Sequence, residues 1–335
     1  MRWLITGSAG FIGYHVAAHL LNLGHEVAGV DGMTPYYDVS LKEKRHALLR
    51  EAGRFTSLCA MIESSEKIAA FTTNFAPEVV LHLAGQAGVR FSLVDPGAYV
   101  KGNVLGGYSV LELCRAIRPK HVLIASTSSV YGDSGDFPLV ETAQTDWPLT
   151  PYAASKKALE VVAHTYSHLW DLPITICRFF TVYGPWGRPD MAVFKFVTNI
   201  LSGLPIDVFN HGRVVRDYTY VDDVVRAVVA LSDVVPAVDR KAGGGDTLSA
   251  VAPYRIVNIG GNQPVGLLDL ISEIERATGR TAIRNYVSMQ AGDVPRTEAS
   301  SELLQTLISY SPTTPIRAGI SEFVAWYKSY YGGSS

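Results

Sequence analysis

The sequence contains little cysteine and little net charge, and it has no long apolar run. Only three cysteines, Cys59, Cys114 and Cys177, occur in 335 residues, in apolar surroundings and without a C-x-x-C spacing. This pattern predicts free, buried thiols in a reducing, cytoplasmic compartment and argues against a disulfide framework. No uncharged apolar stretch reaches the roughly 20 residues that a membrane helix needs. We also expect no targeting segment before the first strand, because that strand follows the initial methionine directly.

The charge balance excludes ligands that bind through bulk electrostatic attraction. The chain has 29 basic and 31 acidic residues, for a net charge of −2. We therefore expect no nucleic-acid or membrane partner, and any polyanionic ligand must be held by a local pocket. The histidine pairs His15/His19 and His164/His168 have a spacing that can bind zinc. Neither pair lies in an H-E-x-x-H context or has an evident third ligand, so we predict no metal site.

The first half of the chain alternates short apolar runs with amphipathic stretches. The expected strands are Trp3–Thr6, Glu26–Val30, Phe55–Cys59, Val79–Leu83, His121–Ala125 and Ile174–Arg178. The expected helices between them include Phe11–Leu23, Ser65–Phe75, Ala98–Ile117 and Pro151–Leu169. Strands that alternate with helices predict right-handed crossovers and a doubly wound, parallel α/β sheet with helices on both faces.

After about Tyr183 this alternation ends, and proline and glycine become frequent in residues 184–189. We expect residues 1–180 to form the sheet domain, with later segments returning to it. Residues 181–335 are then mainly a smaller, mixed α/β C-terminal lobe that binds the substrate. The low-complexity stretch KAGGGDTLSAVAP (Lys241–Pro253) predicts a flexible surface insertion at about 236–253.

A glycine-rich loop follows the first expected strand and opens the first expected helix. In ITGSAGFIG the glycines Gly7, Gly10 and Gly13 have the spacing G-x-x-G-x-x-G. Such a loop brings the backbone close to a pyrophosphate at a helix N-terminus, as in a Rossmann-type dinucleotide site. Asp31 ends the next strand, where a carboxylate accepts hydrogen bonds from ribose hydroxyls and repels a 2′-phosphate. We therefore predict NAD rather than NADP as cofactor.

A tyrosine and a lysine lie four residues apart at the start of an expected helix. Tyr152 and Lys156 in TPYAASKKALE share one helix face. A lysine ammonium beside a phenol can lower the pKa of the phenol from about 10 towards neutral pH. The phenolate could then take a proton from an alcohol hydroxyl while nicotinamide accepts a hydride.

These features together resemble the extended short-chain dehydrogenase/reductases. The glycine loop, the S-S-V-Y-G run (Ser128–Gly132) and Y-A-A-S-K (Tyr152–Lys156) carry the resemblance. It implies Thr127, Tyr152 and Lys156 as the catalytic set. The cofactor contacts that it implies are Gly7, Gly10, Phe11, Ile12, Gly13, Asp31, Ile62, Leu83, Ala84, Tyr152 and Lys156.

Further segments resemble one class of that family, the UDP-glucuronate 4-epimerases. They are YYDVSLKEKR (Tyr36–Arg45), LAGQAGVRFS (Leu83–Ser92), AHTYSHL (Ala163–Leu169), RFFTVYGPWGRPDMAVFKF (Arg178–Phe196) and GDVPRT (Gly292–Thr297). The resemblance implies a UDP-sugar substrate and a homodimer built from the helices 98–117 and 151–169. Met61 departs from it, because the family usually carries at this position an aspartate that contacts adenine.

The residues after Thr127 distinguish between reactions on this scaffold. Dehydratases similar to this protein hold Asp-Glu there, and UDP-glucuronate decarboxylases usually carry an acidic residue before Val-Tyr-Gly. This chain has Ser128 and Ser129 instead. Epimerisation at C4 is therefore the leading interpretation. Alternatives are UDP-glucuronate decarboxylation, 4-epimerisation of neutral UDP-hexoses, or a non-catalytic NAD-binding regulator.

A uronate substrate also needs groups that hold its carboxylate and its nucleotide. Ser128, Ser129 and Thr181 are the candidate hydroxyl donors, and Arg188 is the candidate charged partner, because guanidinium–carboxylate hydrogen bonds are strong and directional. The resemblance links Arg90 and Arg216 to the diphosphate, Phe209 and Asp293 to the nucleoside, and Asn103 to the sugar site.

Overall fold

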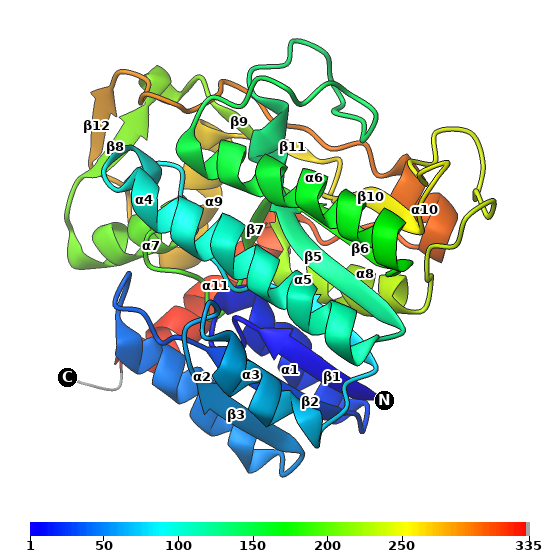
Figure 1. The fold of residues 1–335 in the computed structure, drawn as a ribbon. Coiled ribbons are helices and arrows are strands. Elements are labelled where there is room, and N and C mark those ends of the chain that lie inside the picture. Colours follow the sequence, from blue (N-terminus) through cyan, green and yellow to red (C-terminus); the bar gives the residue numbers. More distant parts are fainter. Residues whose placement is uncertain (333–335) are drawn as a thin grey trace.

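The computed structural model describes residues 1–332, which form a sheet domain with a smaller lobe beside it (Figure 1). Within these residues, the main sheet has seven parallel strands in the order β10-β6-β5-β4-β1-β2-β3. They are β1 (Arg2–Thr6), β2 (Glu26–Asp31), β3 (Phe55–Cys59), β4 (Val79–His82), β5 (His121–Thr127), β6 (Ile174–Phe179) and β10 (Tyr254–Ile259). The strand order turns between β1 and β4, so the predicted doubly wound sheet is confirmed.

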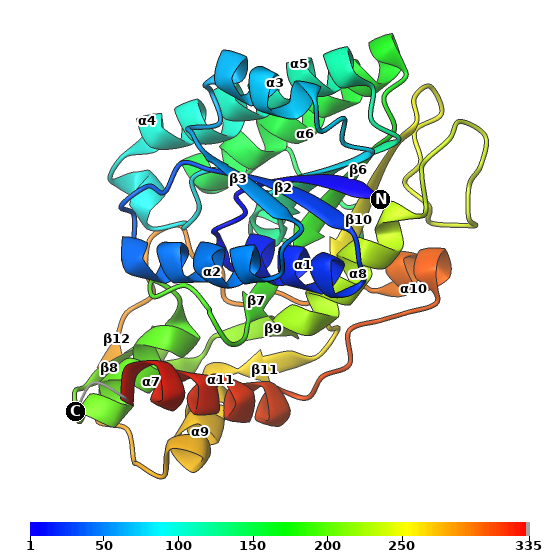
Figure 2. The same ribbon diagram turned by 90° about the horizontal axis from the view of Figure 1, so that it is seen from below.

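Helices cover both faces of this sheet (Figure 2). One face carries α3 (Ser65–Thr73), α5 (Gly106–Ile117) and α6 (Pro151–Trp170), and the other carries α1 (Phe11–Asn22), α2 (Val39–Glu51), α8 (Val221–Ser232) and α10 (Glu302–Ile308). Side chains alternate along each strand, so β1 sends Trp3 and Ile5 into the core with α1 and α8, and Leu4 into the core with α5 and α6. Burial on both faces explains the continuous apolar runs of the strands.

Two elements differ from the sequence prediction close to the site. Strand β5 extends two residues beyond the expected end, because Ser126 and Thr127 still pair with β6. The expected helix 98–117 is divided into α4 (Pro96–Tyr99), the π-helical segment η2 (Val100–Leu105) and α5. Asn103 lies in η2 with its side chain fully buried, and its Nδ2 donates to Ser155 Oγ at 2.8 Å and to Gln86 O at 3.0 Å. Such π-helical turns often occur at functional sites.

The smaller lobe has its own core and two small sheets. One sheet has the order β11-β9-β7 and the other pairs β12 with β8. Its elements are β7 (Thr181–Tyr183), α7 (Ala192–Ser202), β8 (Ile206–Phe209), β9 (Val215–Tyr220), β11 (Pro264–Gly266), α9 (Leu267–Thr278), β12 (Arg284–Val287) and α11 (Ile316–Tyr331). Their apolar faces meet around Phe194, Ile271 and Phe323. The chain after residue 180 contributes to both parts, since β10 is a strand of the main sheet and α8 and α10 pack on that sheet.

The low-complexity stretch is only partly a surface insertion. Residues 241–245 are exposed, but Asp246 is buried and forms an ion pair with Arg255, with Nε 2.8 Å from Oδ1. Leu248 and Ala252 are buried as well. The expected loose insertion is therefore wrong from Asp246 onward, because a charged side chain from β10 anchors this segment to the sheet.

The three cysteines are free, but they differ in burial. Cys114 and Cys177 are buried, and burial raises the pKa of each thiol to about 12. Cys59 is exposed at the end of β3, which corrects the expectation of three buried thiols. Among the described residues, no helix is both long and apolar enough to cross a membrane.

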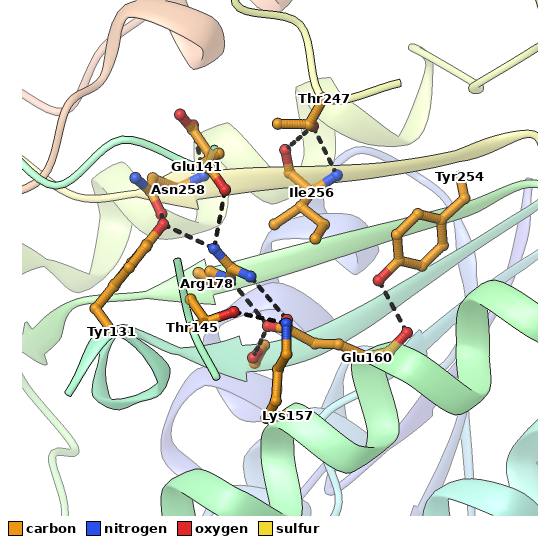
Figure 3. Close-up of polar contacts among 11 residues, drawn as sticks. Tyr131, Glu141, Thr145, Lys157, Glu160, Arg178, Thr247, Tyr254, Ile256 and Asn258 are labelled. Atoms are coloured by element: carbon orange, nitrogen blue, oxygen red, sulfur yellow. Dashed lines mark hydrogen bonds and ion pairs between the residues drawn. The ribbon is translucent and has the colours of Figure 1, made fainter. Parts of the chain in front are cut away.

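A buried polar network connects the sheet to α6 (Figure 3). Arg178 on β6 donates to both carboxylate oxygens of Glu160 on α6, at 2.9 Å and 2.8 Å, and each side chain is only 2% exposed. Ser126 on β5 donates to Glu160 Oε1 at 2.5 Å. Arg178 also donates to the Tyr131 hydroxyl at 3.0 Å, which in turn donates to Asn258 on β10 at 2.7 Å. The network therefore holds three neighbouring strands and α6 in one arrangement.

Replacing Glu160 by glutamine should destabilise the fold strongly. The substitution keeps the size of the side chain but leaves the buried Arg178 guanidinium without its counter-ion, which costs about 3–5 kcal/mol. The free energy of unfolding from urea titration measures this loss. A suitable control is Glu273→Gln, because Glu273 pairs with the surface residues Arg276 and Arg317. Equal losses in both variants would contradict a central role for the buried pair.

Candidate active site

A cavity of about 560 Å³ lies at the carboxyl ends of the central strands. In doubly wound sheets, ligands bind at this edge, where the strand order turns. The cavity brings together most of the side chains and backbone segments that the sequence analysis selected. These are Gly7, Gly10, Phe11, Ile12, Gly13, Asp31, Ile62, Leu83, Ala84, Thr127, Ser128, Ser129, Tyr152, Lys156, Thr181 and Arg188.

The glycine loop forms a cradle with no room for side chains. A Cβ atom at Gly13 would lie 2.1 Å from Gly7 O, and one at Gly7 would lie 2.8 Å from Ala84 N. Gly7 also has a φ of +75°, a conformation that strongly favours glycine. Helix α1 begins directly after this loop, and no side chain caps its N-terminus. Its first N–H groups and the positive end of its dipole therefore suit a pyrophosphate.

Asp31 is fixed at the end of β2 beside this cradle. Its Oδ2 accepts a hydrogen bond from Ala9 N at 3.0 Å, and its Oδ1 accepts one from Met33 N at 2.9 Å. The carboxylate is buried to 9% exposure and lines the cavity. The cradle and this carboxylate together fit a dinucleotide with free ribose hydroxyls, as NAD has.

Met61 lines the same cavity, 39% exposed, in place of the usual aspartate. Glu63, which the sequence analysis did not select, also lines it. Within residues 1–332 no group donates a hydrogen bond to either Glu63 carboxylate oxygen, although Lys101 Nζ lies 3.2 Å from Oε1. A carboxylate therefore remains in this region despite Met61. The sequence does show an acidic residue, Glu63, two positions after Met61, and this was the signal that could have identified it.

Thr127, Tyr152 and Lys156 meet at the other side of the cavity. Thr127 ends β5, and the other two lie in the first turns of α6. The Thr150 hydroxyl caps α6 by accepting from Ala153 N at 3.3 Å, and Pro151 suits the first helical position. Lys156 Nζ donates to Ala125 O at 3.0 Å, two residues before Thr127. The start of the helix thus positions the tyrosine and lysine against the end of the strand.

Burial is the main influence on the pKa values of Tyr152 and Lys156. Burial raises the pKa of Tyr152, and a hydrogen bond with the Thr127 hydroxyl and the charge of Arg188 act to lower it. The lowering effect of Lys156 on the pKa of this phenol remains a prediction. Burial lowers the pKa of Lys156 to about 8, and the Glu160 carboxylate opposes this shift.

The two serines after Thr127 form a short 3₁₀ turn, η3 (Ser128–Tyr131), and both line the cavity. Ser129 N donates to Thr127 Oγ1 at 3.2 Å, and the two hydroxyl groups lie 3.2 Å apart. Thr181 on β7 adds a hydroxyl from the smaller lobe. Hydroxyl groups therefore occupy the positions next to Thr127 where related enzymes carry acids.

Arg188 enters the cavity from the loop between β7 and α7. Its guanidinium forms a bidentate ion pair with Asp190, with Nε 3.0 Å from Oδ1 and Nη2 2.5 Å from Oδ2. Tyr36 donates to the same carboxylate at 3.2 Å. Asp190 and Tyr36 were not selected from the sequence, although both lie in the quoted motifs, because motif spacing does not reveal contacts between distant loops.

Five predicted substrate residues do not line the cavity. Arg90 lies 4.6 Å over the Phe209 ring, and Arg216 Nη2 lies 2.6 Å from Asp293 Oδ1. Burial lowers the pKa of Arg90, and the charge of Asp293 acts to raise it, so Asp293 influences both arginines. Asn103 Nδ2 instead donates to the backbone oxygen of Gln86, and Gln86 does line the cavity.

The pKa of Lys156 predicts a specific pH dependence of stability. Below about pH 8 the lysine is charged in both the folded and the unfolded chain, and the full cost of burying its charge is present. Between about pH 8 and 10.5 the unfolded chain binds more protons, so the stability of the folded protein rises with pH. Relative to Lys156→Met, the wild type should gain about 3 kcal/mol across this window.

Urea unfolding of both proteins at several pH values measures this difference. A control is Lys328→Met, which replaces a lysine on α11 that is remote from the cavity. A difference between wild type and Lys156→Met that stays constant from pH 7 to 10.5 would show that burial does not lower the pKa of Lys156.

Known proteins that are similar to this chain bind the kind of ligands that this site fits. Residues 3–259 match the family model described as the NAD dependent epimerase/dehydratase family. A probable UDP-glucuronate 4-epimerase of Rhizobium meliloti is 51% identical over 334 residues, which covers 99% of this chain and 98% of that protein. UDP-glucuronate 4-epimerase 4 of Arabidopsis thaliana is 43% identical and covers 98% of this chain and 76% of its own length.

The fold matches solved structures over its whole length. The crystal structure of UDP-glucuronic acid 4-epimerase from Bacillus cereus, in complex with UDP-glucuronic acid and NAD, has a TM-score of 0.88 and 32% sequence identity. The match covers 99% of this chain and 100% of that chain. The glycine cradle, the paired tyrosine and lysine and these matches lead to one conclusion: the chain belongs to the NAD dependent epimerase/dehydratase family.

Proposed function

We propose that this protein inverts C4 of UDP-glucuronate to give UDP-galacturonate. The named relatives from Rhizobium meliloti and Arabidopsis thaliana and the Bacillus cereus structure support this substrate. The observation that carries the choice of reaction is the end of β5. Thr127, Ser128 and Ser129 line the cavity together with Tyr152, so no acid is available next to Thr127 for elimination of water.

NAD is the cofactor that the cavity fits. The glycine cradle would hold its pyrophosphate, Asp31 would accept hydrogen bonds from its adenine ribose, and Phe11, Ile12, Ile62, Leu83 and Ala84 would line its remaining surface. When bound, NAD supplies the hydride acceptor and donor for C4. The side chains of the protein then have to move one proton and hold the sugar.

We assign proton transfer to Tyr152, which takes the proton from the O4 hydroxyl and later returns it. Thr127 orients the reacting hydroxyl and lowers the pKa of Tyr152 against the effect of burial. Lys156 keeps the end of β5 against α6 through its bond to Ala125 O. The sugar with a carbonyl at C4 can then present either ring face, and no net redox change results.

A uronate makes this reaction more demanding, because a 4-keto uronate is a β-keto acid that can lose carbon dioxide. The cavity must hold the carboxylate away from the geometry for that loss while the ring turns. Ser128, Ser129 and Thr181 are short donors that suit two ring orientations, and Arg188 is the directional partner.

The smaller lobe supplies the nucleotide contacts in this proposal. Arg90 and Arg216 would bind the diphosphate, and Phe209 and Asp293 would contact the nucleoside. Asn103 would act on the sugar site through the Gln86 turn that it supports. Residues 1–180 then form mainly the cofactor domain and residues 181–335 mainly the substrate lobe.

We also propose a cytoplasmic homodimer that associates through α5 and α6. Apolar side chains are exposed on these two helices and on η2, with Leu105 at 48%, Tyr108 at 46%, Val161 at 54% and Leu169 at 64%. Several large apolar side chains exposed on two helices that pack together favour a protein contact there. The free thiols Cys114 and Cys177 suit a reducing compartment.

The direct test of the function is to incubate the purified protein with UDP-glucuronate and separate the products. We expect UDP-galacturonate, and we expect Tyr152→Phe to reduce its rate of formation at least about 100-fold, because general acid–base catalysis contributes that much. Tyr286→Phe, in an exposed residue outside the cavity, is the matched control.

Formation of a UDP-pentose without UDP-galacturonate would refute the epimerase proposal and favour a decarboxylase. Turnover of Tyr152→Phe near that of the wild type would refute the assignment of the proton-transferring residue.

A further inference from the structure

Arg188, the proposed partner of the substrate carboxylate, already has a carboxylate partner in the protein. Asp190 binds its Nε and Nη2 atoms in a bidentate pair, and the two side chains are 22% and 24% exposed. The charge of Arg188 lowers the pKa of Asp190 although burial acts to raise it. Asp190 is therefore ionised at neutral pH, and the pair as a whole carries no net charge.

A second domain holds this pair in place. Tyr36, in the loop after β2, donates to Asp190 Oδ2 at 3.2 Å. Burial and the Asp190 charge raise the pKa of Tyr36 to about 12, so its hydroxyl stays protonated as a donor. The 85–91 loop leaves room for this contact, because a Cβ at Gly88 would lie 2.3 Å from Tyr36 Oη. Tyr36 also packs on Phe91, with ring centroids 5.3 Å apart.

The bidentate pair leaves one edge of the guanidinium available. Within the described part of the chain, Asp190 engages Nε and Nη2 of Arg188, and Nη1 is not among the buried atoms without partners. The guanidinium also interacts with the Tyr36 hydroxyl, which acts to lower the pKa of Tyr36 against burial and the Asp190 charge. Arg188 lines the cavity together with Tyr152, Ser128 and Ser129. The Nη1 group can therefore donate directional hydrogen bonds to a ligand while Asp190 fixes the plane of the guanidinium.

Because Asp190 neutralises Arg188, the attraction between Arg188 and an anionic ligand is weaker, which matters for a ligand that must be released and rebound. A guanidinium with full positive charge attracts a carboxylate strongly in a site shielded from water. Close to Asp190 that attraction is largely cancelled, and the hydrogen bonds from Nη1 keep their direction. Such a group can orient a carboxylate and still release it readily.

We propose that Asp190, held by Tyr36, is a positioning residue that neutralises Arg188, so that the uronate carboxylate is oriented during oxidation yet released when the ring turns. This inference rests on the proposed function, because only epimerisation of a uronate needs both properties. The Asp190–Arg188 pair then sets the preference for anionic over neutral sugars and the rate of ring rotation.

The test is Asp190→Asn in the full-length protein with NAD. The variant keeps an acceptor for Arg188 but restores its net positive charge. We expect UDP-glucuronate to bind roughly tenfold more tightly, since one unit of charge is uncovered near its carboxylate. The affinity for UDP-glucose should change less than about twofold, because that sugar has no carboxylate. Calorimetric titration of both ligands measures the two affinities.

Catalysis should change in the opposite direction. The value of kcat with UDP-glucuronate should fall while KM falls as well, and absorbance of the reduced nicotinamide should build up during turnover because ring rotation becomes slow. Tyr36→Phe removes only the neutral hydroxyl that donates to Asp190. It should lower kcat and KM as Asp190→Asn does, but to a smaller extent. Glu298→Gln is the matched control, because Glu298 also pairs with an arginine two residues away, at 2.5 Å, and lies outside the cavity.

An unchanged or lower ratio of UDP-glucuronate to UDP-glucose affinity in Asp190→Asn would overturn the proposal and indicate a purely structural pair. A higher ratio of UDP-glucuronate to UDP-glucose affinity together with an unchanged kcat would overturn the claim that Asp190 eases release of the carboxylate during ring rotation. Failure of the wild type to form UDP-galacturonate would instead refute the proposed function, while the affinity ratio would still report on charge neutralisation.

Discussion

The buried ion pair between Glu160 and Arg178 is the interaction on which the rest of the site depends. Glu160 lies one turn after Lys156 on α6, and its carboxylate also accepts a hydrogen bond from Ser126, next to Thr127. One carboxylate therefore connects the helix that carries Tyr152 and Lys156 to the strand that carries Thr127. Because the pair is almost completely shielded from water, its geometry is rigid, and loss of either partner leaves an uncompensated charge. Precise placement of reacting groups is what such a network can provide.

Two cationic side chains that line the cavity have carboxylate partners within the protein. Glu160 offsets the burial of Lys156, and Asp190 offsets Arg188. Outside the cavity, Asp293 is paired with Arg216 in the same way. Around Tyr152 the polar groups that line the cavity are consequently mainly hydroxyls and partly neutralised cations, whereas the carboxylates of Asp31 and Glu63 line another part of it. This arrangement suits a sugar that must turn over within one site, since each contact is directional and none is dominated by an unbalanced charge.

The sequence predicted the local features well and the contacts between distant segments poorly. The six expected strands match β1 to β6 closely, because the apolar runs of buried parallel strands are easily recognised. The spacing of the glycines likewise predicted the backbone cradle between β1 and α1. The end of β5 was placed too early, because pairing of Ser126 and Thr127 with β6 is a tertiary effect without an apolar signal. The burial of Asp246 and the Tyr36–Asp190–Arg188 contact were missed for the same reason. The helical spacing of Tyr152 and Lys156 predicted that both lie in the first turns of α6, but it did not show that the ammonium of Lys156 bonds to Ala125 O.

In the proposed reaction, C4 is inverted by removal and return of the same hydrogen, and the protein handles only the hydroxyl proton. UDP-glucuronate labelled with deuterium at C4 tests this most directly, with the position of the label in the product read by nuclear magnetic resonance. We expect UDP-galacturonate to retain the deuterium at C4 in ordinary water. Loss of the deuterium to solvent would contradict it, because C4 would then be inverted by a route in which its hydrogen exchanges with water.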